Sequence, residues 1–215
     1  MKTRMAIIAL LFACALPMSA FATIYGFGPC ISNNNPASCA AFDQFFVDVT
    51  AVGDQVLFKF TNIGDIQSII ADIYFDDGSL AGVASITGST GVSFSEGANP
   101  ADLPAGNNAI PPFVATFSAD ADSPVDNGIN NTGDEWLEIL FDLDENTELG
   151  DVLADLESGA LRIGIHVQGF ANGMSETFIN DGPGPGPEPI PEPATLLLLG
   201  SGLAGLGLAV WRRRN

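Results

Sequence analysis

Apolar and polar residues alternate in several short segments of this 215-residue chain. The alternation is regular in residues 45–51, stops at Gly53-Asp54, and resumes in residues 56–60. Because successive side chains of a strand point to opposite faces of a sheet, two such segments around a short turn predict a β-hairpin. Residues 161–167 alternate in the same way and predict another strand with one buried face. This pattern constrains the chain to a fold built from sheets.

The rest of the chain between its two ends predicts further short strands and one helix. Further strands are expected at residues 66–75, 83–87, 92–95, 113–117, 136–143 and 174–179. Residues 149–156 change to helical spacing, and Gly159 is expected to end that helix. Residues 23–41 and 120–133 are expected to be irregular. Short strands with regular turns and a single short helix predict a mainly β fold, an antiparallel β-sandwich of jelly-roll type over residues 23–180.

Residues 1–22 have the three parts of a secretory signal peptide. A basic start is followed by an apolar core over residues 5–16 and by the small-x-small site Ala20-Phe21-Ala22. We therefore expect cleavage before Thr23. Two alternatives are a lipoprotein signal that ends at Cys14 and an uncleaved N-terminal anchor.

Residues 194–211 contain no charged side chain. As a helix with about 1.5 Å rise per residue they would span about 27 Å, close to the roughly 30 Å of a bilayer core, so they predict a transmembrane helix. Arg212, Arg213 and Arg214 follow directly and would hold that end in the cytoplasm. A Gly/Pro-rich linker over residues 181–190 precedes the tail. These features alone are also those of an ordinary tail anchor.

Residues 191–215 as a whole resemble a known sorting signal. Pro191, Glu192 and Pro193, followed by a glycine-containing apolar helix and an arginine cluster, are similar to the PEP-CTERM signal of exported proteins in exopolysaccharide-producing Gram-negative bacteria. The resemblance implies processing by exosortase, a membrane cysteine transpeptidase. It also implies a transient anchor in the inner membrane, followed by delivery to the cell surface or the extracellular space.

The region between the two ends also resembles a recurrent ectodomain of PEP-CTERM proteins. The similarity lies in residues 72–78, 91–95 and 161–170. It supports export of the chain, but no activity follows from it.

The charge of the chain is strongly unbalanced. Its 26 acidic and 7 basic residues give a net charge of −19, and only Lys59 and Arg162 among the basic residues lie between the two terminal segments. The region between those segments is therefore more acidic than the chain as a whole. Such a charge repels nucleic acid and anionic lipid, and it attracts divalent cations or cationic polymers. We expect no nucleic-acid partner.

Acidic residues in and just after the loop 120–133 are candidate ligands for calcium, which prefers oxygen donors. The candidates are Asp120, Asp122, Asp126 and Asp134. Residues 142–146 begin like an EF-hand loop, but Thr147 and Leu153 stand where that loop requires glycine and glutamate. The alternative for both runs is a solvated acidic loop, and no other cofactor is expected.

Cys30 and Cys39 are the cysteines that remain once the signal peptide is removed. An even pair in an oxidising compartment predicts a disulfide, which here would close a short loop. The alternative is a metal site with two cysteine ligands, but the usual paired spacing and a nearby histidine are missing.

The sequence contains no pattern that predicts an active site. His166 is the single histidine, no Gly-x-Ser-x-Gly occurs, and His166 is expected to be an ordinary polar residue on a solvated face or at a sheet edge. Acidic pairs such as Asp76-Asp77 would serve a glycosidase only across a cleft of defined width. Trp136 and Tyr74 could stack on sugar rings, although aromatic residues on strands more often belong to the core.

These features predict a non-enzymatic exported protein with a structural or interaction role at the cell surface or in an exopolysaccharide-containing matrix. The alternative is a calcium-dependent carbohydrate-binding module that grips exopolysaccharide through its acidic loops. The expected partners are exosortase, the inner membrane and exopolysaccharide.

Overall fold

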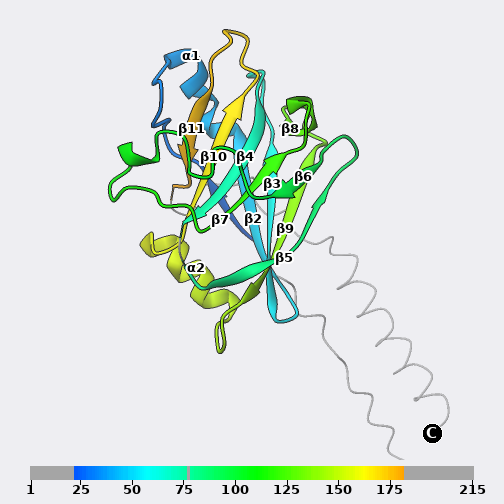
Figure 1. Ribbon diagram of the computed structural model, residues 1–215, viewed down its shortest axis with the longest axis vertical. Helices are drawn as coiled ribbons and strands as arrows, with labels where there is room; N and C mark the ends of the chain where they lie inside the picture. The colour runs from blue at the N-terminus through cyan, green and yellow to red at the C-terminus, as the bar shows by residue number, and fades with distance from the viewer. Residues whose placement is uncertain (1–21, 77, 182–215) are drawn as a thin grey trace, which may run out of the picture.

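The computed structural model describes residues 22–76 and 78–181, which form two antiparallel sheets (Figure 1). The first sheet has the order β1-β2-β3-β9-β5, with β1 at Thr23–Gly26, β2 at Phe45–Val52, β3 at Gln55–Asn62, β9 at Trp136–Leu143 and β5 at Leu80–Gly88. The second has the order β11-β10-β4-β7-β6, with β11 at Glu176–Ile179, β10 at Arg162–Gln168, β4 at Ile69–Asp76, β7 at Phe117–Ala121 and β6 at Phe94–Glu96. The short strand β8 at Ile129–Asn130 pairs with β4.

The hairpin predicted from the alternation is confirmed. Strands β2 and β3 pair without a register shift, from Phe45 opposite Asn62 to Val52 opposite Gln55. The turn between them contains Gly53 with a φ of 67°, a left-handed conformation that favours glycine. One face of each strand is buried and the other is partly exposed to solvent, as the period of two requires.

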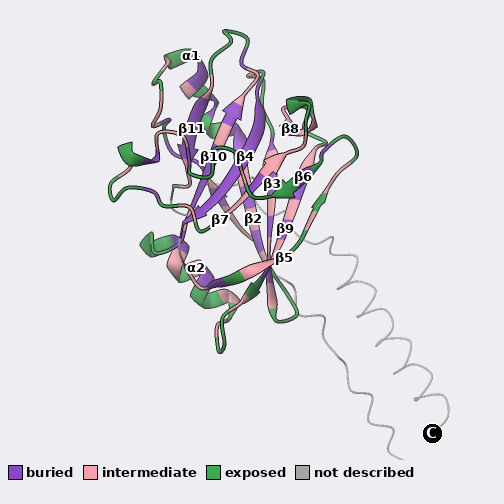
Figure 2. Cartoon of the chain, in the orientation of Figure 1, coloured by how far each residue is buried: buried purple, intermediate pink, exposed green. Residues whose placement is uncertain are grey.

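Aromatic rings fill the space between the two sheets. The ring centroids of Phe58 on β3 and Phe75 on β4 are 5.2 Å apart, and those of Phe75 and Phe141 on β9 are 4.7 Å apart. Phe45 on β2 and Phe178 on β11 form a third pair at 5.1 Å. Each pair joins the first sheet to the second, so both sheets contribute to one hydrophobic core, and Figure 2 shows this burial concentrated along the strands.

The predicted helix is also confirmed, as α2 at Leu149–Ser158. Val152 and Leu156 bury one side of it against the core. It ends at Gly159, whose φ of 77° is the left-handed conformation common just after helices. The other helical segments among the described residues are short: α1 at Pro36–Cys39 and the 3-10 segments η1 at Ala40–Gln44, η2 at Gly106–Asn108 and η3 at Val125–Asn127.

The structure corrects the predictions for three segments. Residues 23–41 are not wholly irregular, because they contain β1 and α1. The strand predicted at 113–117 lies later, where β7 begins at Phe117. The predicted loop 120–133 consequently contains the end of β7, and also η3 and β8.

Residues 98–115, which we call the cover, explain the misplaced strand. Phe113 forms a second, smaller hydrophobic cluster with Leu103 and with Tyr74 of β4, on the face of the second sheet opposite the main core. Its apolar side chain therefore belongs to the cover rather than to a strand.

Arg162 on β10 fastens the cover to the sheet. Its guanidinium donates to the carbonyl oxygens of Pro111 and Pro112, at 2.6 and 2.8 Å, and pairs with the carboxylate of Asp76 on β4. The guanidinium carbon also lies 5.3 Å from the ring centroid of Phe113. Arg162, one of the two basic residues between the terminal segments, thus has a structural role.

Candidate functional site

The segments predicted to direct export lie outside the described residues, apart from Ala22 and Asp181. They are the signal peptide over 1–22, the linker over 181–190, the helix over 194–211, and the residues Pro191, Glu192, Pro193, Arg212, Arg213 and Arg214. Within the described part of the chain, no helix combines the length and the apolar character that a membrane crossing needs. The structure therefore bears on the domain that precedes the tail.

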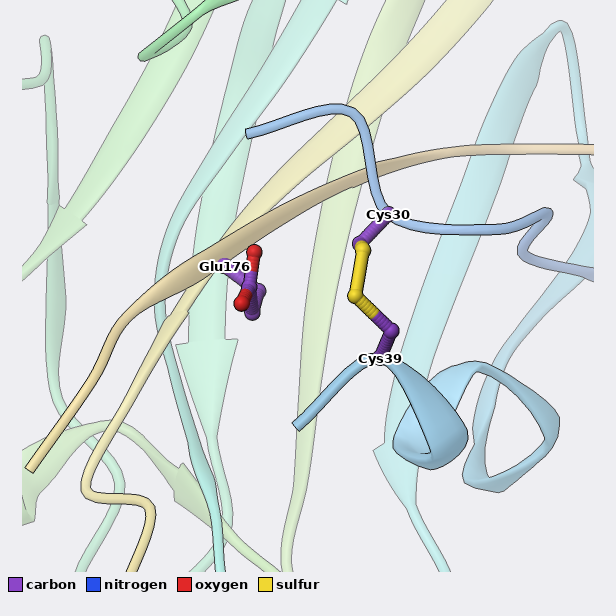
Figure 3. A group of neighbouring side chains, drawn as sticks. All are labelled: Cys30, Cys39 and Glu176. Carbon is purple, nitrogen blue, oxygen red and sulfur yellow. A yellow bond between two sulfur atoms is a disulfide. The ribbon is translucent and has the colours of Figure 1, made fainter. Parts of the chain in front are cut away.

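Cys30 and Cys39 form a disulfide, as predicted, with their Cα atoms 5.2 Å apart. Cys30 lies in the segment after β1, and Cys39 is the last residue of α1. Because the two sulfur atoms are bonded to each other, neither is a thiolate that could bind a metal, which argues against the two-cysteine metal site. The carboxylate of Glu176 on β11 lies beside the disulfide (Figure 3).

Glu176 is fully buried and its carboxylate is satisfied by the loop that the disulfide closes. The hydroxyl of Ser32 donates to it at 2.7 Å, the backbone N–H of Asn33 at 3.0 Å, and the backbone N–H of Asn35 at 3.1 Å. Burial of a carboxylate without such donors would be strongly unfavourable. Glu176 therefore ties the N-terminal loop to the last strand of the domain.

The four candidate calcium ligands have different surroundings. The carboxylate of Asp120 on β7 is hydrogen-bonded to Asp72, whereas that of Asp122 accepts from the hydroxyls of Ser93 and Ser95. Asp126 and Asp134 are exposed. Among the described residues, the group close enough to hold a metal consists of Cys30, Cys39 and Glu176, so the four aspartates form no preassembled cluster. Calcium binding by them stays a prediction.

Three further acidic side chains on β9 or directly before it are held in structural contacts. Asp142 accepts from the side chain of Gln55, and Glu135 accepts from the backbone and side chain of Asn130. Glu138 forms an ion pair with Lys59 at 3.5 Å. In these pairs the carboxylates fix strands and turns.

A row of three ionisable side chains crosses the outer side of the second sheet. His166 on β10 lies opposite Asp72 on β4, which lies opposite Asp120 on β7. The His166 Nδ1 atom is 2.7 Å from the Asp72 carboxylate, and the His166 side chain is only 14% exposed. The prediction that His166 is on a solvated face or at a sheet edge is wrong, because β10 is an inner strand and the imidazole is paired.

Partial burial and the neighbouring Asp72 raise the pKa of Asp120 to about 6. Burial is the larger cause, followed by the hydrogen bond to Asp72 and its negative charge; Asp122 adds a smaller effect, and a hydrogen bond with the backbone of Asn99 acts in the opposite direction. A carboxyl group hydrogen-bonded to a carboxylate retains its proton to higher pH. The row can therefore hold a proton in mildly acidic solution.

The two aromatic residues considered for sugar binding differ in exposure. Tyr74 is buried, and its hydroxyl donates to the carbonyl oxygen of Pro100 at 3.0 Å. Burial, with smaller effects from Asp72, Asp120 and Asp102, raises the pKa of that hydroxyl. Trp136 is only partly buried, and the ammonium group of Lys59 lies 4.8 Å from its ring centroid. Tyr74 thus belongs to a core, whereas Trp136 is accessible.

A groove of about 570 Å³ lies between the β2–β3 turn and the start of α2. Its polar lining includes Asp54, Gln55 and Glu148. The Glu148 side chain accepts the N–H of Asp151 and so caps α2, while Gln55 is bonded to Asp142. These contacts give Gln55 and Glu148 a structural role at the groove.

Sequence reasoning missed Glu176 and Asp72 because their partners are distant in the chain. Glu176 and Ser32 are 144 positions apart, and His166 and Asp72 are 94 positions apart. The one sequence signal that could have identified these two residues is a polar residue at a strand position in a mostly apolar segment.

Comparison with known proteins supports one part of the chain. A sequence-family model described as the PEP-CTERM protein-sorting motif matches residues 189–214. No curated protein and no solved structure matches the chain. Such a motif implies export, transient membrane anchoring and exosortase as the processing partner, while the match does not extend into the domain. The chain therefore carries a PEP-CTERM protein-sorting motif.

Proposed function

We propose that this protein is an exosortase-processed component of the cell surface or of an exopolysaccharide-containing extracellular matrix, with a structural or interaction role. The observation that carries the proposal is the sorting motif at residues 189–214, which follows a domain fastened by a disulfide. A disulfide suits a protein that works outside the cytoplasm. The acidic surface keeps such a domain soluble and repels nucleic acid.

We infer that the domain is a β-sandwich of jelly-roll type. The inference is supported by the aromatic contacts between the sheets and by a chain path that passes repeatedly from one sheet to the other, as from β3 to β4 and from β4 to β5. Domains of this architecture serve many binding and structural roles.

We propose further that the domain is not an enzyme. The ionisable groups described above serve the fold: His166 pairs with Asp72, Arg162 fastens the cover, and Glu176 holds the N-terminal loop. Catalysis would require an acid, base or nucleophile aimed into a cleft. Hydrolysis of polysaccharides by the purified protein would overturn this part of the proposal.

A calcium-dependent carbohydrate-binding module is the second candidate, and the accessible Trp136 favours it. The Trp136 ring could stack on a sugar, with Glu138 on the same strand face. In this case Trp136→Ala should abolish retention on exopolysaccharide, and EDTA should weaken it. Retention that ignores both changes would exclude this candidate and leave the structural role.

Processing is tested in the native host by the intact mass of the protein and by its location. Glu192→Ala, or removal of Arg212, Arg213 and Arg214, should leave the uncut chain in the inner membrane. The unaltered protein should be recovered outside that membrane with a C-terminus near Pro191. Full-length protein found only in the inner membrane would mean that the tail is an anchor and that the proposed location is wrong.

A further inference from the structure

Residues 27–39, which we call the strap, run along the open side of β11. Phe27 forms a bridge with Asn180, and the N–H of Gly28 donates to Ile179 at 2.9 Å. Further along, the N–H of Ile31 donates to the carbonyl oxygen of Thr177 on β11 at 2.9 Å. Figure 1 shows this N-terminal segment beside β11 at the edge of the second sheet. The strap thus covers backbone groups that an edge strand would otherwise expose.

Side chains add a second set of contacts between the strap and β11. The hydroxyl of Ser32 accepts the N–H of Thr177 at 2.9 Å and donates to Glu176 at 2.7 Å. The side chain of Asn33 donates to the carbonyl oxygen of Ser175 at 2.7 Å. The N–H groups of Asn33 and Asn35 complete the shell around the Glu176 carboxylate.

The buried carboxylate alone does not hold the strap firmly. Burying Glu176 costs desolvation free energy, and its three hydrogen bonds offset that cost rather than greatly exceed it. If the strap lifts away, water can solvate the carboxylate, so the open form carries no buried unpaired charge. The hydrogen bonds to Glu176 therefore contribute little net free energy to closing, so a covalent constraint on the strap can decide whether it stays closed.

The disulfide supplies that constraint. Cys30 and Cys39 are nine positions apart and both lie in the strap, so the bond restricts the loop that presents the Glu176 donors. Phe27 and Cys30 of the strap belong to the main core, whereas the aromatic pairs that join the two sheets lie outside the strap. Loss of the bond should loosen the strap while the aromatic pairs between the sheets stay in contact.

We propose that the strap is a redox-controlled fastening of β11, closed in the oxidised protein and locally open in the reduced protein. Closing converts the Cys30 and Cys39 thiols into one disulfide, and the two electrons and two protons pass to a disulfide oxidant, which becomes two thiols. Directly before the strap, the carbonyl oxygen of Gly26 accepts the N–H of Asp181, just after β11, at 3.1 Å. Oxidation thereby fixes the strand from which the sorting tail departs.

Hydrogen–deuterium exchange on the purified folded protein tests the proposal, before and after reduction with dithiothreitol. Amides of residues 27–33, and that of Thr177 on the side of β11 that the strap covers, should exchange at least about tenfold faster after reduction, because local opening becomes frequent. The Asn180 amide, which donates to Ile163 of β10, should not change. Amides of the hairpin 45–62 should not change. Reduction of protein that is already folded avoids dependence on a cysteine variant that fails to fold.

Two serine variants separate the strap from general destabilisation. Ser32→Ala removes the contacts with Glu176 and Thr177, and should speed exchange in the strap and β11. Ser95→Ala removes a serine–carboxylate hydrogen bond of the same 2.7 Å length elsewhere and should leave that region unchanged. Unchanged exchange on reduction, or faster exchange across the whole domain, would overturn the proposal.

Discussion

Arg162→Met is the substitution that best tests how the cover is held. Arg162 joins three parts of the domain, because it lies on β10, pairs with Asp76 on β4 and donates to Pro111 and Pro112 of the cover. Methionine keeps an unbranched apolar side chain in place of the arginine stem but removes the charge and all of the donors. The variant therefore isolates the polar contacts from the packing.

The expected loss of stability follows from the burial of the Arg162–Asp76 ion pair. The side chains of Arg162 and Asp76 are 15% and 10% exposed, so the ion pair is largely shielded from water. Removing one partner of a buried pair typically costs about 3–5 kcal/mol. Asp76 keeps the hydrogen bond from the N–H of Val114 at 3.1 Å, which lowers the cost. We expect Arg162→Met to reduce the free energy of unfolding by about 3 kcal/mol.

Urea unfolding followed by circular dichroism measures this loss, and a double-mutant cycle with Asp76→Asn assigns it. If the pair is the cause, the double variant should lose less stability than the sum of the single variants, by at least about 1 kcal/mol. Limited proteolysis should also cut within residues 98–115 of the Arg162→Met protein. A loss under about 1 kcal/mol with additive single variants would refute the reasoning.

Two further predictions have matched controls in the same chain. Gly159→Ala should cost about 1 kcal/mol in urea unfolding because φ at Gly159 is 77°, whereas Gly150→Ala within α2 should be neutral or stabilising because no atom crowds the added methyl and φ is not positive. Equal effects of the two would contradict the cap. Tyr74→Phe should cost about 1 kcal/mol by losing the bond to Pro100, while Tyr25→Phe should cost nothing because the Tyr25 hydroxyl makes no hydrogen bond among the described residues. A thermal melt distinguishes them, and a larger loss for Tyr25→Phe would reverse the argument.

Local patterns were enough to predict much of the fold. The β2–β3 hairpin depends on alternation and on a glycine turn, and α2 depends on helical spacing and on Gly159, all of which are contained in short windows. β1 escaped prediction because four residues are too few to show a period, and its pairing with β2 crosses an intervening loop. The predicted start of β7 was wrong because the apolar Phe113 packs in the cluster under the cover and is not part of a strand.

The site was less predictable because its contacts join distant parts of the chain. The disulfide was predicted, since cysteine chemistry and export are enough for it. The burial of Glu176 and the pairing of His166 with Asp72 depend on which strands become neighbours. A shift of one residue in register would send the His166 side chain to the other face. Sequence alone therefore suggested a solvated His166 where the structure has a paired one.

Asp120→Asn makes the row of ionisable groups testable through pH. The pKa of Asp120 is raised from 3.8 to about 6 in the folded protein, so the folded state binds the proton more tightly than the unfolded state. This contribution to stability is complete below about pH 4 and is lost as the pH rises through about 6. Because Asp120 is partly exposed, solvent screening limits the loss to about 1 kcal/mol.

Asparagine can donate a hydrogen bond to Asp72 at every pH, as the protonated Asp120 does. Asp120→Asn should therefore match the unaltered protein near pH 4 and exceed its stability at pH 7, as measured by urea unfolding across that range. Asp122→Asn is the control, because the stability contribution of Asp122 depends on pH in the opposite direction. The hydroxyls of Ser93 and Ser95 lower the pKa of Asp122, so its contribution is lost as the pH falls. If Asp120→Asn keeps the pH slope of the unaltered protein between pH 4 and 7, then Asp120 does not hold the proton and its pKa is not raised.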